Sequence, residues 1–304
     1  MTATAAASAT SPPPAAAPAT RGGLGYMVQS AFWFAVMSLM VKFASRSLPT
    51  MEIVFARGVV ALVLASAMLA HARKSPLGGR LGLLLLRGAI GSTALVCYFG
   101  AVAHLPLAEA AVIHQTAPLF TALLAAWVLR ERLELRVVVA LVGAFAGVLL
   151  IAHPDWLFGP RATTQAPWPW QFAFVALLGA ILSAFAYVTV RRLGRSESPL
   201  VVVFWFHALT VPIAAPFALP AWQWPDAGDW ALLVGIGVTT QLAQVAMTKG
   251  FAREAAGRAA AVGYLQVAFA TLFSITVFDD WPDAWRWSGI GLIVASLLLP
   301  LWRR

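Results

Sequence analysis

Apolar residues fall in long blocks along the chain, and short polar segments separate these blocks. A helix that crosses a bilayer needs about 20 predominantly apolar residues. The pattern therefore predicts an all-α polytopic membrane protein. Its ten spanning helices are expected at residues 24–43, 51–70, 81–102, 108–129, 135–152, 171–190, 199–219, 229–249, 257–278 and 284–302.

The composition agrees with a lipid environment. Of the 304 residues, 61% are hydrophobic and 11% are charged, whereas soluble domains carry about 25% charged residues. The one cysteine, Cys97, lies inside an apolar block, so no disulfide framework or cysteine metal cluster is expected. We expect no cofactor.

Positive charge orients the chain in the membrane. Fifteen of the 21 Lys and Arg residues lie on one side if the N-terminus is cytoplasmic, and such a bias marks the cytoplasmic face. The net charge of +9 thus reflects membrane orientation rather than nucleic-acid binding. We predict an inner-membrane protein with both termini in the cytoplasm. The other six basic residues are four in outer loops, Lys42, Arg46, Arg161 and Arg286, and two within helices, Arg57 and Arg87.

The two halves of the chain are similar at an offset of 149 residues. Phe120 aligns with Phe269, Glu131 with Asp280, and Lys42 with Arg191. Each half holds five predicted helices, an odd number, so the second half must enter the membrane inverted. The loop charges change sign accordingly, which is typical of inverted-repeat transporters. We predict a disordered Ala/Pro-rich tail (1–23), a first repeat (24–152), a periplasmic linker (153–170) and a second repeat (171–304).

Several short motifs in the first half resemble the EamA family of drug/metabolite transporters. They are Arg87-Gly88, Tyr98, the segment from Leu105 to Ala108, the segment from Thr116 to Phe120, the segment from Leu129 to Glu131, Gly143 and Gly147. The match is best with the G branch of the solute carrier 35 group and its bacterial relatives. The resemblance implies that helices 1–4 and 6–9 line a transport pathway and that helices 5 and 10 pack beside it. The second repeat departs from the pattern at Val267, which aligns with Pro118.

Arg57 lies about six residues inside the second predicted helix. A charge at a helix centre costs roughly 2.5–3.5 kcal/mol on insertion scales. Arg57 is therefore either a cationic anchor for an anionic or zwitterionic substrate, or a structural arginine that bonds backbone carbonyls. Arg87 lies nearer the cytoplasmic end, where a long side chain reaches the polar surface, and this favours a structural role.

Acidic residues are absent from the centres of the predicted helices. All twelve Asp and Glu residues fall in loops, in the linker or at helix ends. Carriers of lipophilic cations use a buried carboxylate, so the distribution argues against such a substrate.

Other polar residues at membrane depth are candidates for a substrate site or for contacts between helices. His114 and Gln115 precede Pro118, and a proline frees backbone carbonyls. Gln241, Gln244 and Thr248 form a stripe on the eighth helix, which residues on the sixth and ninth could face. His207 is expected to be a packed histidine. The substrate-binding candidates are Trp33, Arg57, Tyr98, His114, Gln115, Tyr187, Gln241, Gln244, Tyr264 and Gln266.

The predicted function is secondary-active, alternating-access transport of a small polar metabolite, anionic or zwitterionic, with the lipid bilayer as its solvent. The chain has no GxxxxGK[ST] phosphate loop, so ATP is not expected to drive transport. The coupling proton or ion and the monomeric or homodimeric state stay open. The alternatives are a scaffold or sensor without transport, an exporter of amphipathic drugs or cations, and an intramembrane enzyme. The enzyme would need a motif such as HExxH or GxSxG, and the sequence has neither. Small residues on the fifth and tenth helices predict close packing or a dimer surface, at Gly143, Gly147, Gly289 and Gly291.

Overall fold

The computed structural model describes residues 22–105, 107–153, 155–158, 170–278 and 281–298. Within these ranges every regular element is helical. Nine helical stretches there are long and apolar enough to cross a membrane, and a shorter apolar helix of 15 residues follows them. The prediction of an all-α membrane protein is confirmed. Residues 1–21, most of the predicted linker 153–170 and residues 299–304 lie outside the described ranges.

Seven of the spans are uninterrupted helices, and the shorter apolar helix is α13 (Ala284–Leu298). Local sequence sets several of their starts. Pro199 opens its helix in the first turn, where the missing amide hydrogen costs nothing. The side chain of Asp226 accepts the amide hydrogen of Asp229 at 2.7 Å and so caps another helix. The seven are α1 (Gly23–Ala44), α2 (Thr50–His71), α3 (Leu81–Val102), α6 (Leu135–Ala152), α8 (Trp170–Leu193), α9 (Pro199–Ala218) and α10 (Ala227–Arg253).

The other two spans, predicted at 108–129 and 257–278, are each broken into two helices. The first consists of α4 (Leu107–His114) and α5 (Ala117–Val128), and the second of α11 (Ala256–Val262) and α12 (Leu265–Phe278). Pro118 explains the first break, because it cannot donate a helical hydrogen bond and sits in the first turn of α5. The second break contains no proline.

The two breaks face each other. The hydroxyl of Tyr264 donates a hydrogen bond to the backbone carbonyl of Gln115 at 2.9 Å. These residues lie 149 positions apart, which is the offset between the two halves of the sequence. An equivalent interruption in each half therefore meets its counterpart in the interior of the protein.

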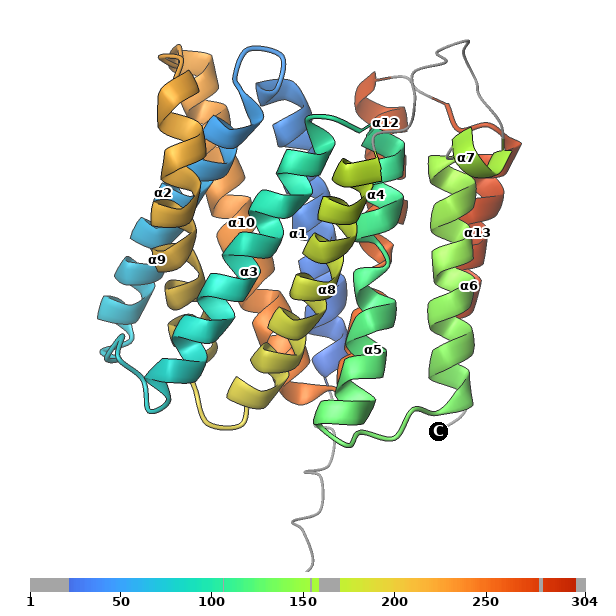
Figure 1. Cartoon of the computed structure of the whole chain (residues 1–304), viewed down its shortest axis with the longest axis horizontal. Coiled ribbons are helices and arrows are strands. Elements are labelled where there is room, and N and C mark those ends of the chain that lie inside the picture. Colours follow the sequence, from blue (N-terminus) through green and yellow to red (C-terminus); the bar gives the residue numbers. More distant parts are fainter. Residues whose placement is uncertain (1–21, 106, 154, 159–169, 279–280, 299–304) are drawn as a thin grey trace, which may run out of the picture.

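The helices stand side by side, with α1 beginning and α13 ending at the lower side of the view (Figure 1). The contacts between helices come in equivalent pairs, in which each helix of one half is replaced by the helix about 149 residues away in the other half. α1 packs on α10 as α8 packs on α3, and α2 packs on α10 as α9 packs on α3. α1 also meets α12, as α8 meets α5. α6 and α13 pack against each other beside the other helices.

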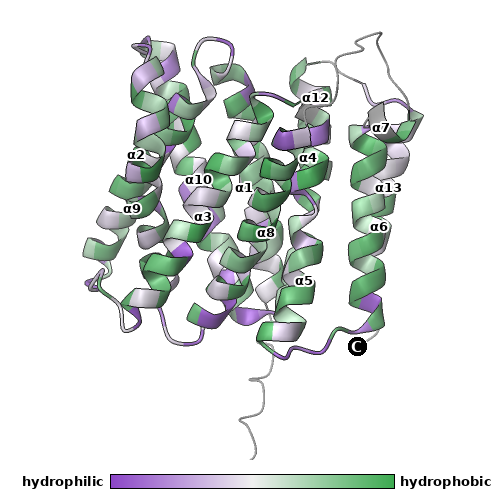
Figure 2. Ribbon diagram, in the orientation of Figure 1, coloured by the Kyte–Doolittle hydropathy of each residue, from purple (hydrophilic) through white to green (hydrophobic). Residues whose placement is uncertain are grey.

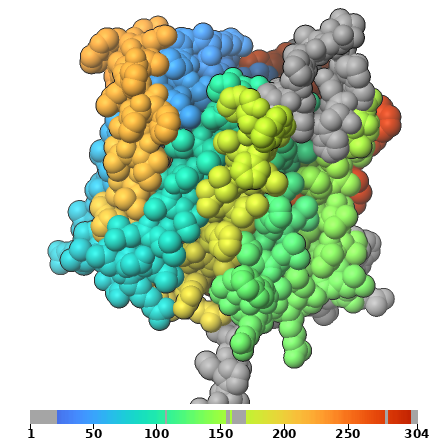
Figure 3. All heavy atoms as spheres, in the orientation of Figure 1, coloured from blue at the N-terminus to red at the C-terminus, as the bar shows by residue number. Residues whose placement is uncertain are grey.

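The outer surface of the bundle is apolar. Hydrophobic residues dominate the middle of the helices, and hydrophilic residues gather toward their ends (Figure 2). Side chains of α3, α8 and α5 lie side by side on one face and fill the spaces between the ribbons (Figure 3). Large apolar side chains point outward, among them Trp127, Leu135, Val142 and Phe174. Lipid tails are the solvent that suits such a surface.

Small residues bring α6 and α13 into close contact. A methyl group on either Gly147 or Gly289 would lie 2.6 Å from the carbonyl oxygen of the other. Gly143 lies in the same way against Ser296. Gly291 has no neighbour within 4 Å of the place a methyl would occupy, so it takes no part in the α6–α13 contact, and a dimer surface stays the prediction for this position. The contact within one chain explains the small residues at the other three positions.

Gly289→Ala is expected to destabilise the protein by about 1–3 kcal/mol, because the added methyl overlaps a backbone oxygen that cannot move independently. Thermal unfolding of the purified protein would measure the change. Gly291→Ala, on the same helix, is the matched control and should leave the midpoint nearly unchanged. Equal midpoints for the two variants would contradict the close α6–α13 contact.

Candidate functional site

Arg57 on α2 is a buried cation. Its side chain is 6% exposed, and its Nη1 lies 3.4 Å from the sulfur of Met37 on α1. The guanidinium carbon stands 5.5 Å from the ring centre of Phe99 on α3. Tyr98, the preceding residue, is close enough for its hydroxyl to interact electrostatically with Arg57. Arg57 forms no ion pair with any residue that the structure describes.

Arg87 on α3 is buried more completely, with 2% of its surface exposed. The expectation that it reaches the polar surface is therefore wrong. Gly91, one turn further along, has no side chain to occupy the space where the guanidinium lies. The guanidinium carbon stands 4.4 Å from the ring centre of Phe206 on α9. Its Nε and Nη1 have no hydrogen-bond partner among the described residues.

His207 links the surroundings of the two arginines. It lies on α9, is 1% exposed, and is close enough to both Arg57 and Arg87 for their charges to act on its ring. Gln241 of α10 lies beside it. The two side chains are close enough to interact with each other, although Nε2 of His207 and Oε1 of Gln241 form no short hydrogen bond within the described chain. The sequence favours a packed histidine at this position. The ring is indeed buried, but its neighbours are the polar residues of a candidate site.

The polar stripe on α10 lies inside the protein. Gln241, Gln244 and Thr248 are all buried, and Thr240 lies next to them in the sequence. A side-chain oxygen of each of these four residues lacks a hydrogen-bond partner in the described part of the chain. Leaving a buried polar group unsatisfied costs about 1–3 kcal/mol. Water or a bound solute is the usual partner at such a position.

Two further candidates meet near Arg57. The rings of Tyr98 and His114 are 4.4 Å apart, and both side chains are partly buried. Nδ1 of His114 has no partner among the described atoms. Trp33 on α1 is also partly buried and packs edge-on against Phe32, at 5.4 Å. Arg57, Tyr98 and His114 thus join α2, α3 and α4 at one place.

The remaining candidates have other neighbours. The hydroxyl of Tyr264 bonds to the carbonyl of Gln115 at the helix breaks. Tyr187 stacks on Phe251 at 5.1 Å, and its hydroxyl is close enough to interact electrostatically with Arg87. Gln266 is partly buried on α12.

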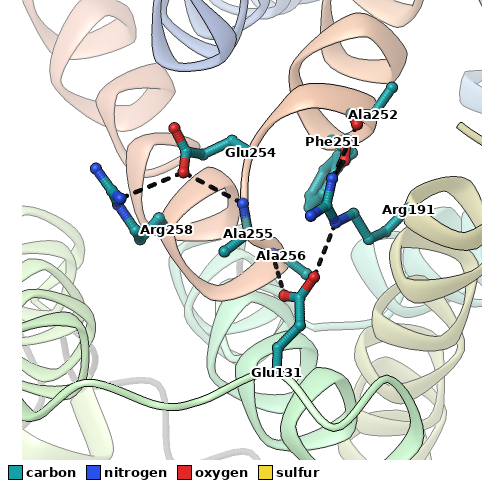
Figure 4. A network of polar contacts seen from close by, with 8 residues as sticks. All are labelled: Glu131, Arg191, Phe251, Ala252, Glu254, Ala255, Ala256 and Arg258. Carbon is teal, nitrogen blue, oxygen red and sulfur yellow. Dashed lines mark hydrogen bonds and ion pairs between the residues drawn. The ribbon is translucent and has the colours of Figure 1, made fainter. Parts of the chain in front are cut away.

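A polar network ties helix ends together at the lower side of the molecule (Figure 4). Glu131, just after α5, accepts a hydrogen bond from Nε of Arg191 on α8 at 2.8 Å. Its other oxygen accepts the amide hydrogen of Ala256, the first residue of α11, at 2.7 Å. Nη1 of Arg191 donates to the carbonyls of Phe251 and Ala252 at the end of α10, at 3.2 and 2.8 Å.

This Glu131–Arg191 network joins the ends of four helices from both halves of the chain. The carboxylate lies at a helix N-terminus and the guanidinium at a helix C-terminus, so each charge complements a helix dipole. Glu131 also lines a cavity of about 110 Å³ together with Glu254 and Arg258. A second cavity, of about 180 Å³, has an apolar lining from α1, α6, α11, α12 and α13. Neither cavity is lined by Arg57 or Arg87.

A metal site is not found in the described part of the chain, where no three His, Cys, Asp or Glu side chains gather closely enough to hold an ion. Around Arg57 and Arg87, the polar groups that the structure describes are those of histidine, glutamine and tyrosine side chains. These groups bind through charge and hydrogen bonds.

The chain matches the EamA-like transporter family twice, over residues 21–153 and 170–302. The pseudopaline exporter CntI of Pseudomonas aeruginosa is 32% identical over 283 residues, which cover 91% of this chain and 95% of the exporter. Solute carrier family 35 member G1 of Mus musculus is 32% identical over 92% of this chain and 78% of its own length. The riboflavin transporter of Vibrio cholerae is 27% identical over 90% of this chain and 91% of its own length.

A solved crystal structure shares the fold. Its TM-score with this chain is 0.80, the alignment covers 92% of this chain and 96% of the other, and the sequences are 18% identical. The same arrangement of helices is therefore kept at low sequence identity.

Glu131→Ala is expected to destabilise the start of α11, because the amide of Ala256 loses its acceptor and Arg191 loses its counter-ion. A charged hydrogen bond of about 1.5–3 kcal/mol predicts at least roughly ten-fold faster hydrogen exchange near the start of α11. Mass spectrometry of exchanged peptides would measure this. Glu134→Ala is the matched control, since Glu134 is exposed in the same loop and its side chain caps no helix. Unchanged exchange in Glu131→Ala would contradict the network.

Proposed function

Because the chain belongs to the EamA-like transporter family, we propose that it is a secondary-active carrier of a small anionic or zwitterionic metabolite. The relatives are named as transporters of different compounds. Their names therefore support membrane transport rather than catalysis and leave the substrate to be argued from the site. The observation that carries this proposal is the pair of buried arginines, Arg57 and Arg87, neither of which has an acidic partner among the described residues.

The charge of the interior favours an anionic group on the substrate. Buried charges in proteins are normally paired, because desolvation is costly and only an opposite charge offsets it. A substrate carboxylate or phosphate would supply the missing partner of Arg57. An amphipathic cation would meet repulsion at the same place, so export of cationic drugs is the weaker alternative. A zwitterionic substrate also fits this site, because Tyr98, His114 and the glutamines of α10 can bind those of its polar atoms that Arg57 does not contact.

Alternating access between two inverted repeats, 24–152 and 171–304, is the proposed mechanism. It is supported by the equivalent helix breaks and by the paired helix contacts. In this arrangement all ten helices cross the membrane, and residues 153–170 connect the repeats in the periplasm. Both termini are then cytoplasmic, and the Glu131–Arg191 network lies on the cytoplasmic side. That network must break when the carrier opens inward.

The opposite end of the helix bundle has a basic residue at the position that corresponds to Arg191. Lys42 aligns with Arg191 in the repeat, and its Nζ lies 3.9 Å from the ring centre of Phe278 at the end of α12. Asp280, which aligns with Glu131, follows two residues later and lies outside the described ranges. We propose that basic residues close each end in turn.

Arg57→Gln is expected to lower the initial transport rate roughly ten-fold or more, because a charge-assisted hydrogen bond is worth about 1.5–3 kcal/mol. Proteoliposomes loaded with a mixture of anionic, zwitterionic and cationic metabolites, followed by mass spectrometry of the efflux, would measure it. Arg195→Gln, at an exposed loop position, is the control and should transport normally. A scaffold or sensor would show no flux in any variant. Normal flux in folded Arg57→Gln would show that Arg57 is not the anchor.

The topology predicts which loops a membrane-impermeant thiol reagent reaches in intact cells. In a Cys97→Ser background, a single cysteine in the linker 153–170 should be labelled from outside. A cysteine replacing Arg132, in the loop after α5, should be labelled only after permeabilisation. A cytoplasmic linker would contradict the inverted repeats.

A further inference from the structure

Arg57 and Arg87 approach the interior from opposite ends of the molecule. α2 runs downward in the view of Figure 1 and α3 runs upward. Arg57 lies seven residues beyond Thr50, and Arg87 lies six residues beyond Leu81. A helical rise of about 1.5 Å per residue places Arg57 about 10 Å along α2 and Arg87 about 9 Å along α3, measured from the starts of these oppositely directed helices. His207 is close to both arginines, so the two cations bracket it.

Each arginine rests against an aromatic ring instead of a carboxylate. Arg57 lies over Phe99 and Arg87 over Phe206. Such contacts stabilise a cation but leave its charge in place. Neither arginine forms an ion pair with a described residue. The interior therefore holds two positive charges that no described side chain neutralises.

Unsatisfied groups lie between and beside these charges. Nε and Nη1 of Arg87 are buried donors without acceptors in the described chain, and His207 and Gln241 lie close enough to interact with each other without forming a short hydrogen bond through Nε2 or Oε1. A guanidinium presents a planar set of donors that matches the two oxygens of a carboxylate. The arrangement thus offers an anion-binding group at each end and hydrogen-bonding groups in the middle.

We propose that the substrate carries two anionic groups, as a dicarboxylate does, and that Arg57 and Arg87 each bind one of them. His207 and Gln241 bind polar atoms of the segment that connects the two carboxylates. This inference rests on the proposed function and narrows its substrate class from one anionic group to two. A dianion neutralises both buried charges at once, which a monoanion or a zwitterion cannot do.

Linear α,ω-dicarboxylates of increasing length, compared with monocarboxylates of the same lengths at equal ionic strength, test the proposal. The readout is the thermal midpoint of the purified full-length protein, since a ligand that binds only the folded state raises it. At least one dicarboxylate should bind roughly ten-fold or more tightly than the monocarboxylate of equal length. The optimum should fall at one chain length, because the two arginines are fixed in the bundle.

Variants of Arg87 then test whether this residue binds the second carboxylate of the ligand. Arg87→Gln should remove the preference for dicarboxylates while monocarboxylates still bind through Arg57. Arg80→Gln is the matched control, because Arg80 is exposed at the start of the same helix and should keep the preference. Arg87→Lys, which keeps the charge but not the planar fork, should weaken the preference without abolishing it. It also replaces Arg87→Gln if that variant does not fold.

The outcomes separate this inference from the proposed function. Equal binding of the two series, or a dicarboxylate preference that survives in Arg87→Gln, overturns the two-anion site. If Arg57→Gln then abolishes the binding of both series, the anionic carrier still stands. Absence of binding by both series in the wild-type protein contradicts the two-anion site and the anionic substrate together.

Discussion

Two buried positive charges with no acidic partner among the described residues are the constraint on which the rest of the site depends. Arg57 and Arg87 are almost fully buried, and each is stabilised mainly by an aromatic face. A protein that only needed stability would be served equally well by apolar side chains, since buried charges seldom add net stability. Retaining both arginines makes sense where an anionic solute supplies the opposite charge during transport.

In the proposed mechanism, the two inverted repeats let such a site be reached from two sides. One helix in each half is interrupted at an equivalent position, and the interruptions meet through Tyr264 and the carbonyl of Gln115. Helix breaks free backbone groups that a membrane tolerates only inside protein or beside water. At one end of the bundle, Glu131 and Arg191 join helix termini from both halves. A single ion pair with three further hydrogen bonds is a contact that a carrier can break and remake.

The sequence predicts the helical class and most of the spans, because the length of an apolar block is a local property set by the thickness of the bilayer. It also points to Arg57, since a charge at membrane depth is unusual wherever it occurs. It does not reveal the burial of Arg87, which depends on the absence of a side chain at Gly91 and on Phe206 from a distant helix. The break at Tyr264 could not be predicted in the same way as the first, because it contains no proline. The contact of Arg87 with Phe206 arises from packing between helices, which the sequence of one helix does not contain.

Access to Arg57 from both sides of the membrane is the most direct test of a carrier built on these charges. Met37→Cys in a Cys97→Ser background places a thiol near Arg57, since Nη1 of Arg57 lies 3.4 Å from the sulfur of Met37 in the present side chain. An impermeant thiol reagent would be applied separately to right-side-out and inside-out vesicles. An alternating-access carrier predicts labelling from both sides, slowed by a bound anion. Labelling from neither side, or from one side only, would contradict it.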